Sequence, residues 1–185
     1  MHWVPNMITL GRLLMVPFLA VMLSNGEYLN AFWLFILVGL SDGLDGYIAR
    51  KFDAKSAAGA VLDPVADKMV LITCVSILAW NGLLPLWLAG PLILRDVVML
   101  GIGLVDPRLR DGWLPPNIWG KSHAALAFVV LALTMLRPGG FVSGELMIVV
   151  PWLLLLATLI VSSGIYYVSW RRLRVERAPK GALPS

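Results

Sequence analysis

Apolar residues follow one another along the chain in six long segments, and short turn-forming stretches separate the segments. Gly, Pro and Asn mark the gaps, in NGE, NGLLP, DPRLRDGWLPPN and RPGG. Each apolar segment is close to the roughly 20 residues that a helix needs to cross the hydrocarbon core of a bilayer. The pattern therefore predicts six membrane-spanning helices, at residues 7–24, 29–50, 57–80, 85–105, 119–136 and 143–170.

Composition supports a membrane protein with an all-α fold. Of the 185 residues, 59% are hydrophobic and 14% are charged, and the mean hydropathy is +0.82. We expect one six-helix transmembrane catalytic domain at residues 1–170 and a polar cytoplasmic tail at 171–185. The opening MHWVPN lacks the basic start of a secretory signal, so the first apolar run is expected to be a spanning helix.

The distribution of Lys and Arg predicts how the helices are oriented. Basic residues gather in the second and fourth connections and after the last helix, whereas the opposite loops carry only Arg137. The basic residues are Arg50, Lys51, Lys55, Arg108, Arg110, Lys121, Arg171, Arg172, Arg174, Arg177 and Lys180. This asymmetry predicts a multi-pass protein of the cell inner (plasma) membrane with both termini in the cytoplasm. The net charge of +4 is assigned to loops that face lipid, with no nucleic-acid partner.

Four aspartates lie close together at the predicted cytoplasmic ends of the second and third helices. They are Asp42, Asp45, Asp63 and Asp67. On a helix, residues three or four apart share a face, so each helix carries one acidic stripe. Gly and Ala are frequent around both stripes and permit close approach of two backbones. We therefore expect the two helices to pack as an antiparallel pair with the stripes facing each other.

Facing carboxylates repel one another in a medium of low dielectric, so they must hold protons or cations. Oxygen ligands suit Mg²⁺ or Mn²⁺ better than zinc, and a pair of such ions is a common arrangement for phosphoryl transfer. The alternative is that some of these aspartates are only solvated helix ends. Because intramembrane acids are costly, a functional role is the default interpretation.

The residues around the aspartates form a pattern that resembles a known signature. Asp42-x-x-Asp45-Gly46-x-x-Ala49-Arg50, then eight residues, then Gly59-x-x-x-Asp63-x-x-x-Asp67 is similar to the signature of the CDP-alcohol phosphatidyltransferases. The resemblance implies the fold of that family and a membrane enzyme that is commonly a homodimer. It also implies transfer of a phosphatidyl group from CDP-diacylglycerol to a hydroxyl, with release of CMP.

The resemblance also implies roles for individual residues. Asp42, Asp45, Asp63 and Asp67 would bind two divalent cations, Mg²⁺ or Mn²⁺, and Asp67 would also act as the general base. Arg50 would contact the diphosphate, while Gly46 and Gly59 would let the cytidine approach the helix backbones. The full set expected around the nucleotide-linked lipid is Asn6, Thr9, Asp42, Gly46, Ala49, Arg50, Ser56 and Gly59.

Two basic residues farther along the chain are candidates for binding the acceptor alcohol. Arg95 lies within an apolar helix, in LILRDVVML, and is expected to face a polar cavity. A pair with Asp96 or a guanidinium that snorkels to the interface is the alternative. Lys121 begins the fifth helix and is either an acceptor ligand or an interfacial anchor. His123 is interpreted as a polar helix-end residue, with proton transfer as the alternative.

The acceptor itself is narrowed by comparing two branches of the resembled family. Phosphatidylglycerophosphate synthases commonly carry Arg-Glu on helix four and a second such pair soon after. This chain has Arg95-Asp96 followed by VVMLGIGLVD, which resembles the CMP-forming cardiolipin synthases instead. Phosphatidylglycerol is therefore the expected acceptor, with glycerol-3-phosphate as the alternative. An ion- or proton-coupled transporter and an inactive metal-binding scaffold remain the non-enzyme alternatives.

Overall fold

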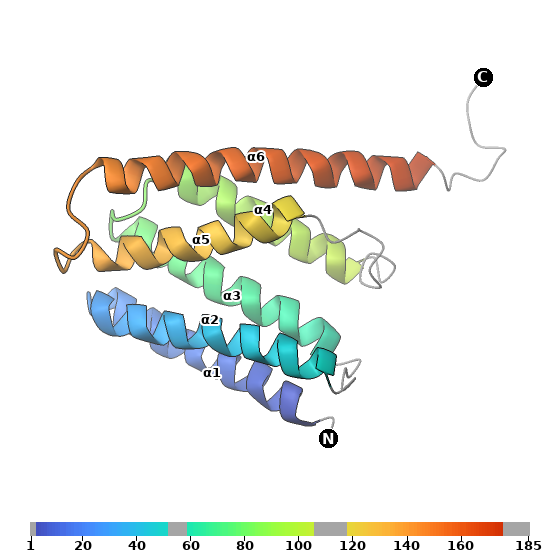
Figure 1. Ribbon diagram of the computed structural model, residues 1–185, viewed down its shortest axis with the longest axis horizontal. Helices are drawn as coiled ribbons and strands as arrows, with labels where there is room; N and C mark the ends of the chain where they lie inside the picture. The colour runs from blue at the N-terminus through green and yellow to red at the C-terminus, as the bar shows by residue number, and fades with distance from the viewer. Residues whose placement is uncertain (1–2, 52–58, 106–117, 176–185) are drawn as a thin grey trace.

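The computed structural model describes the backbone of residues 3–51, 59–105 and 118–175 and the side chains of residues 10–41, 65–101 and 120–168. These parts of the chain are helical, and no strand occurs among them (Figure 1). The helices are α1 (Trp3–Ser24), α2 (Tyr28–Lys51), α3 (Gly59–Trp80), α4 (Leu86–Val105), α5 (Ile118–Leu136) and α6 (Leu146–Val175).

The six predicted helices are confirmed as helices, with bounds close to those expected from the apolar segments. Four of them, α1, α3, α4 and α5, end at the predicted residue. The clearest difference is in α6, which begins three residues later than expected and continues to Val175. Arg and Leu are good helix formers, so the polar residues after Trp170 do not stop the helix at once.

Glycines with positive φ end two of the helices at the turns that the sequence marks with Asn-Gly. Gly26 has φ of 79° and Gly82 has φ of 72°, a conformation that other residues adopt at a cost. Past each glycine, a backbone amide bonds back across the last helical turn. Glu27 N donates to Met22 O at 2.9 Å, and Leu83 N donates to Leu78 O at 2.9 Å. These bonds satisfy carbonyl groups that the helix ends would otherwise leave open.

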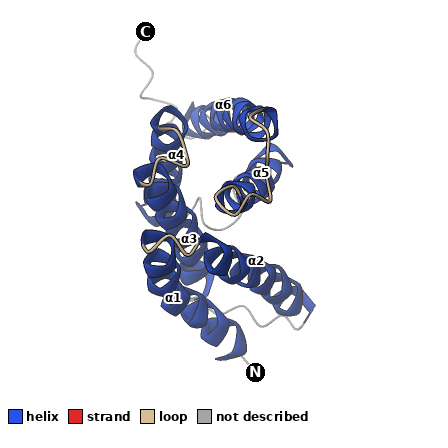
Figure 2. Ribbon diagram, turned by 90° about the vertical axis from the view of Figure 1, so that its left-hand side faces the viewer, coloured by secondary structure: helices blue, strands red, loops and turns tan. Residues whose placement is uncertain are grey.

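The helices close into two rings of four that share an edge (Figure 2). The first ring contains α1, α2, α5 and α3 in that order, and the second contains α3, α4, α6 and α5. Contact between α3 and α5 divides the two rings. Helices α3 and α5 therefore belong to both rings, and α3 packs against α1, α4 and α5.

The expected packing of the acidic ends of α2 and α3 against each other falls mainly on side chains outside the described residues and stays a prediction. Among the helix contacts in the described part of the chain, α1 and α5 each contact both α2 and α3, which lie across the diagonal of the first ring. In the described half of α2, Phe35 stacks on Phe128 of α5 with ring centroids 4.4 Å apart. Gly39 lies against the same ring, because a Cβ added there would meet Phe128 at 2.3 Å.

Buried leucines and other apolar side chains fill the interior of the bundle. The largest of the fully buried ones are Phe35, Leu19, Leu23, Leu78, Leu84, Leu88, Leu131, Met135, Leu155 and Val130. Many large apolar side chains also lie on the outer surface, including Phe18, Trp33, Leu94 and Ile160. Within the described residues, one stretch, Leu146–Val168 of α6, is long and apolar enough to cross a bilayer by itself.

Candidate functional site

The aspartates of the predicted cation site occupy helix ends at one end of the molecule. Asp42 and Asp45 lie near the end of α2, and Asp63 and Asp67 lie in the first half of α3 (Figure 1). The side chains of Asp42, Asp45 and Asp63 lie outside the described residues. In the described part of the chain, no three potential metal ligands come together.

The other residues expected around the nucleotide-linked lipid also fall on these helix ends. Asn6 and Thr9 lie in α1, the set Gly46, Ala49 and Arg50 lies in α2, and Gly59 begins α3. Their side chains, and Ser56 altogether, lie outside the described residues. Alternation of the helices brings the start of α1, the end of α2 and the start of α3 to the same end of the bundle (Figure 1).

Asp67 is the member of the acidic set whose side chain is described, and it is half-buried in α3. The next residue along this helix is Lys68, whose Nζ donates to Asp96 Oδ1 of α4 at 2.8 Å. The pair joins α3 to α4 within the second ring. A cation is thus fixed one residue from the expected general base.

Asp96 Oδ1 also accepts a bond from Arg95 Nη1 at 3.0 Å. Arg95 Nη2 donates to Ser162 Oγ of α6 at 3.1 Å, so the network extends across α3, α4 and α6. The Arg95 side chain is 9% exposed, and its Nε is buried with no hydrogen-bond partner among the described residues. The pairing of Arg95 with Asp96, which was the alternative expectation for this residue, is therefore present.

His123 of α5 completes the polar lining of the second ring. It is buried, and its Nδ1 lies 3.0 Å from Thr158 Oγ1 of α6. His123 lies near the start of α5, as expected of a helix-end residue, and its imidazole is packed inside the bundle. The Thr158 hydroxyl donates to Leu155 O at 2.9 Å, which leaves its oxygen free to accept from the imidazole.

A small cavity lies beside these side chains, and its polar lining comes from Lys68, Arg95, Asp96 and His123. Its volume is about 10 Å³, which is no more than one water molecule requires. A sugar phosphate or a lipid headgroup does not fit in a space of this size. The charged groups therefore bind each other in this arrangement, and the cavity is not an open acceptor cleft.

Comparison with known proteins decides the family. Residues 2–163 match the family described as CDP-alcohol phosphatidyltransferase. The chain belongs to the CDP-alcohol phosphatidyltransferase family. The match covers five of the six helices completely and the first half of α6, so it includes both rings as well as the aspartate motif.

Relatives within the CDP-alcohol phosphatidyltransferase family carry two kinds of name. A probable cardiolipin synthase (CMP-forming) of Drosophila melanogaster is 37% identical over 61% of this chain and 34% of its own length. A cardiolipin synthase (CMP-forming) of Streptomyces coelicolor is 31% identical over 80% of this chain and 72% of its own. A CDP-diacylglycerol--glycerol-3-phosphate 3-phosphatidyltransferase of Pseudomonas fluorescens is 31% identical over 95% and 89%. The chain thus spans about a third of the Drosophila relative.

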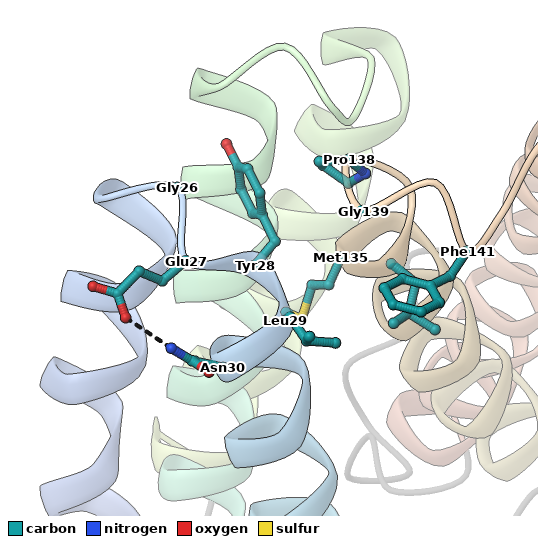
Figure 3. Close-up of a pocket in the computed structure, with 10 residues that line it drawn as sticks. Gly26, Glu27, Tyr28, Leu29, Asn30, Met135, Pro138, Gly139 and Phe141 are labelled. Atoms are coloured by element: carbon teal, nitrogen blue, oxygen red, sulfur yellow. Dashed lines mark hydrogen bonds between the residues drawn. The ribbon is translucent and has the colours of Figure 1, made fainter.

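A second, larger cavity lies at the end of the bundle opposite the family motif. Its volume is about 260 Å³, and it lies between the α1–α2 turn and the segment that follows α5 (Figure 3). Glu27 is its one acidic lining residue, and Glu27 Oε2 accepts a bond from Asn30 Nδ2 at 3.0 Å. Tyr28, Met135 and Phe141 provide much of the remaining surface. The lining contains no basic group for a phosphate.

Two further basic residues, Lys121 and Arg12, occupy different environments. Lys121 is exposed in the first turn of α5, as an interfacial anchor or an acceptor ligand requires. Arg12 of α1 is buried, with 4% of its surface exposed. The Arg12 guanidinium therefore lies inside the bundle and does not snorkel outward from the described surface.

Proposed function

We propose that this protein transfers the phosphatidyl group of CDP-diacylglycerol to a hydroxyl acceptor and releases CMP. The observation that carries the proposal is the complete eight-position motif, placed on adjacent ends of α2 and α3 in a chain that matches the family over residues 2–163. Names of the relatives support the same reaction class. The leaving nucleotide is soluble, so a site at a helix end suits its departure.

Asp42, Asp45, Asp63 and Asp67 would hold two divalent cations, Mg²⁺ or Mn²⁺. The donor set fits such ions, because four carboxylates supply only oxygen ligands. Bound divalent ions neutralise charge on phosphate oxygens and on the departing CMP. Asp67 would take the proton of the acceptor hydroxyl, whose own pKa is far above 7. Arg50 would pair with the diphosphate, and the other motif residues would receive the cytidine.

We also propose that all six helices span the inner (plasma) membrane and that the protein is a homodimer. Support for the membrane comes from the apolar outer surface and from the spanning length of Leu146–Val168. The distribution of Lys and Arg supports placing both termini and the aspartates on the cytoplasmic side. The homodimer rests on the family resemblance alone.

Phosphatidylglycerol is the acceptor that we favour, which makes the product cardiolipin. The polar network supports this choice, because Arg95 is engaged by Asp96 and Ser162, so its guanidinium is already occupied and is a poor partner for a dianion. Glycerol-3-phosphate is the alternative acceptor, and relatives of similar identity carry both names.

The decisive experiment combines purified protein in detergent with CDP-diacylglycerol and either phosphatidylglycerol or glycerol-3-phosphate. CMP release should require Mg²⁺ or Mn²⁺ and should stop when EDTA removes the ion. Mass spectrometry of the lipid product identifies the acceptor. No CMP with either acceptor would overturn the proposed function, and turnover with glycerol-3-phosphate alone would overturn only the acceptor.

Removal of one carboxylate tests the assignment of the base. Asp67→Asn should lower kcat by about 10²–10⁴-fold, the usual contribution of a positioned base. Glu27→Gln is a matched control, because Glu27 is an exposed carboxylate at the opposite end of the bundle. Full activity in Asp67→Asn would reject the base assignment and leave the transfer reaction standing.

A further inference from the structure

We propose that Lys68 binds the phosphate of the acceptor and that Asp96 is the residue that positions it. The inference rests on the proposed function and changes its acceptor site, because sequence analysis assigned this role to Arg95 and Lys121. The ligand chemistry is a phosphate that lies three carbons from the reacting hydroxyl. Glycerol-3-phosphate and phosphatidylglycerol both carry such a group.

Lys68 lies directly beside the expected general base on α3. The residue directly follows Asp67 on α3, so the two Cα atoms are 3.8 Å apart across one trans peptide, as in any chain. Neighbouring residues of a helix project about 100° apart, and the Lys68 ammonium is directed toward α4. The proposal therefore requires the acceptor to extend from the Asp67 carboxylate around the same helical turn to the Lys68 side. Lys68 is 20% exposed, so its ammonium is not sealed inside the bundle.

The hydrogen bonds of Lys68 leave it able to bind a further anion. A lysine ammonium has three donors, and Lys68 uses one of them on Asp96 within the described residues. Asp96 accepts from Arg95 at the same oxygen, so one carboxylate balances two cations. The cluster of these three residues carries one net positive charge, which a phosphate would compensate.

Arg95 is the less suitable phosphate ligand, even though its charge is permanent. Its two terminal nitrogens are already bonded to Asp96 and Ser162, and its side chain is 9% exposed. Moving this guanidinium to a substrate breaks both bonds and leaves Asp96 with a single partner. Arg95 instead holds the Asp96 carboxylate in place, and the carboxylate directs Lys68.

Lys68→Met is the main test, measured as separate kinetic constants for each substrate in the full chain. The variant keeps the apolar stem and leaves Asp96 paired with Arg95, so the buried carboxylate stays compensated. KM for phosphatidylglycerol should rise about ten- to a hundredfold, as loss of a charge-assisted hydrogen bond implies. KM for CDP-diacylglycerol should change less than about twofold. Lys68→Arg should recover most of the loss, because it restores a cation.

Asp96→Asn tests the positioning role, since the amide oxygen still accepts a hydrogen bond but lacks the charge. KM for the acceptor should rise about threefold to tenfold, with a smaller change in kcat. Arg137→Met is the matched control, because Arg137 is an exposed cation at the other end of the helices. Each variant is also checked for binding of CDP with Mn²⁺ by the shift of its melting temperature.

The outcomes separate this inference from the proposed function. An unmodified chain that releases no CMP defeats the proposed function. An active chain whose Lys68→Met variant keeps its acceptor KM defeats only the role of Lys68. Equal rises in the KM of donor and acceptor also defeat it, because they indicate a structural effect. If Lys68→Met does not fold, Asp96→Asn decides: a raised acceptor KM with an unchanged CDP-induced shift supports the inference, and an unchanged acceptor KM overturns it. Parallel assays with glycerol-3-phosphate show whether Lys68 binds the phosphate of that acceptor or of phosphatidylglycerol.

Discussion

The contacts described in the two four-helix rings differ in chemistry. In the first ring, those between described residues include neutral ones: Phe35 stacks on Phe128, and Asn81 Nδ2 donates to Leu23 O at 2.9 Å and lies 3.2 Å from Tyr28 Oη. In the second ring, they include charged ones, in the cluster of Lys68, Arg95 and Asp96. Loss of one neutral contact leaves the other contacts unchanged. Removal of one ion from a cluster leaves its former partners as uncompensated buried charges, which is more costly. The rings should therefore respond differently to single substitutions.

The largest loss of stability is expected where a substitution leaves buried charges uncompensated in the second ring. Asp96→Leu removes the carboxylate that Lys68 and Arg95 share and should lower the free energy of unfolding by about 3–5 kcal/mol. Reversible unfolding in mixed micelles measures this loss. The matched variant is Asp96→Asn, which keeps the shape and an acceptor oxygen and should lose less. Equal stability of Asp96→Leu and the unmodified chain would show that the charge cluster does not hold the second ring.

An intermediate effect is expected at the neutral end of the first ring. Asn81→Ala removes both side-chain bonds and leaves Leu23 O without that donor, which should cost about 1–3 kcal/mol. Acceptor and donor KM should stay unchanged, because Asn81 follows α3 at the end farthest from the aspartates. Asn25→Ala, at an exposed side chain of the neighbouring turn, is the control. A rise in the KM of either substrate would show that this end of the first ring also affects substrate binding, contrary to the prediction.

The smallest effect is expected from backbone conformation alone. Gly82→Ala places a Cβ in open space but at φ of 72°, so strain should cost about 1–2 kcal/mol. Gly90→Ala also meets open space, but Gly90 lies inside α4, where alanine has the better helix propensity. Gly82→Ala should therefore melt at a lower temperature than the unmodified chain and Gly90→Ala at the same temperature or higher. Identical melting temperatures of the two variants would show that the positive φ at position 82 does not require glycine.

The fold was largely predictable because its elements are specified locally. Long apolar runs fix the helices, and Asn-Gly pairs such as Asn81-Gly82 fix where they end. The order of packing was less accessible, since rotation of each helix about its axis depends on pairs such as Gly39 and Phe128, which are 89 positions apart. The antiparallel pairing expected at the acidic ends of α2 and α3 stays a prediction, because most of those side chains lie outside the described residues.

In the candidate site, too, residues with a local sequence signal were predictable, and residues whose partners lie on other helices were not. The spacing of the aspartates carries its own signal, and their role as cation ligands stays a prediction. Lys68, Ser162 and Thr158 were missed as members of a polar network, because their partners lie on other helices. The only signal available was the rarity of charged and hydroxyl residues inside apolar segments. Arg95 and Asp96 were recognisable as a pair because they are neighbours in the chain.

Helix α3 is common to both rings, and this has a consequence for how such a chain can diversify. On the proposed assignments, the first turns of α3 carry Gly59, Asp63 and Asp67 of the nucleotide and metal site. The next residue, Lys68, binds the phosphate of the acceptor alcohol. Substitutions in α4 and α6 reshape the surroundings of Lys68 without touching α1 or α2. A change of alcohol is therefore open to a lineage that leaves its nucleotide chemistry intact, provided that α3, which carries residues of both proposed sites, stays unchanged.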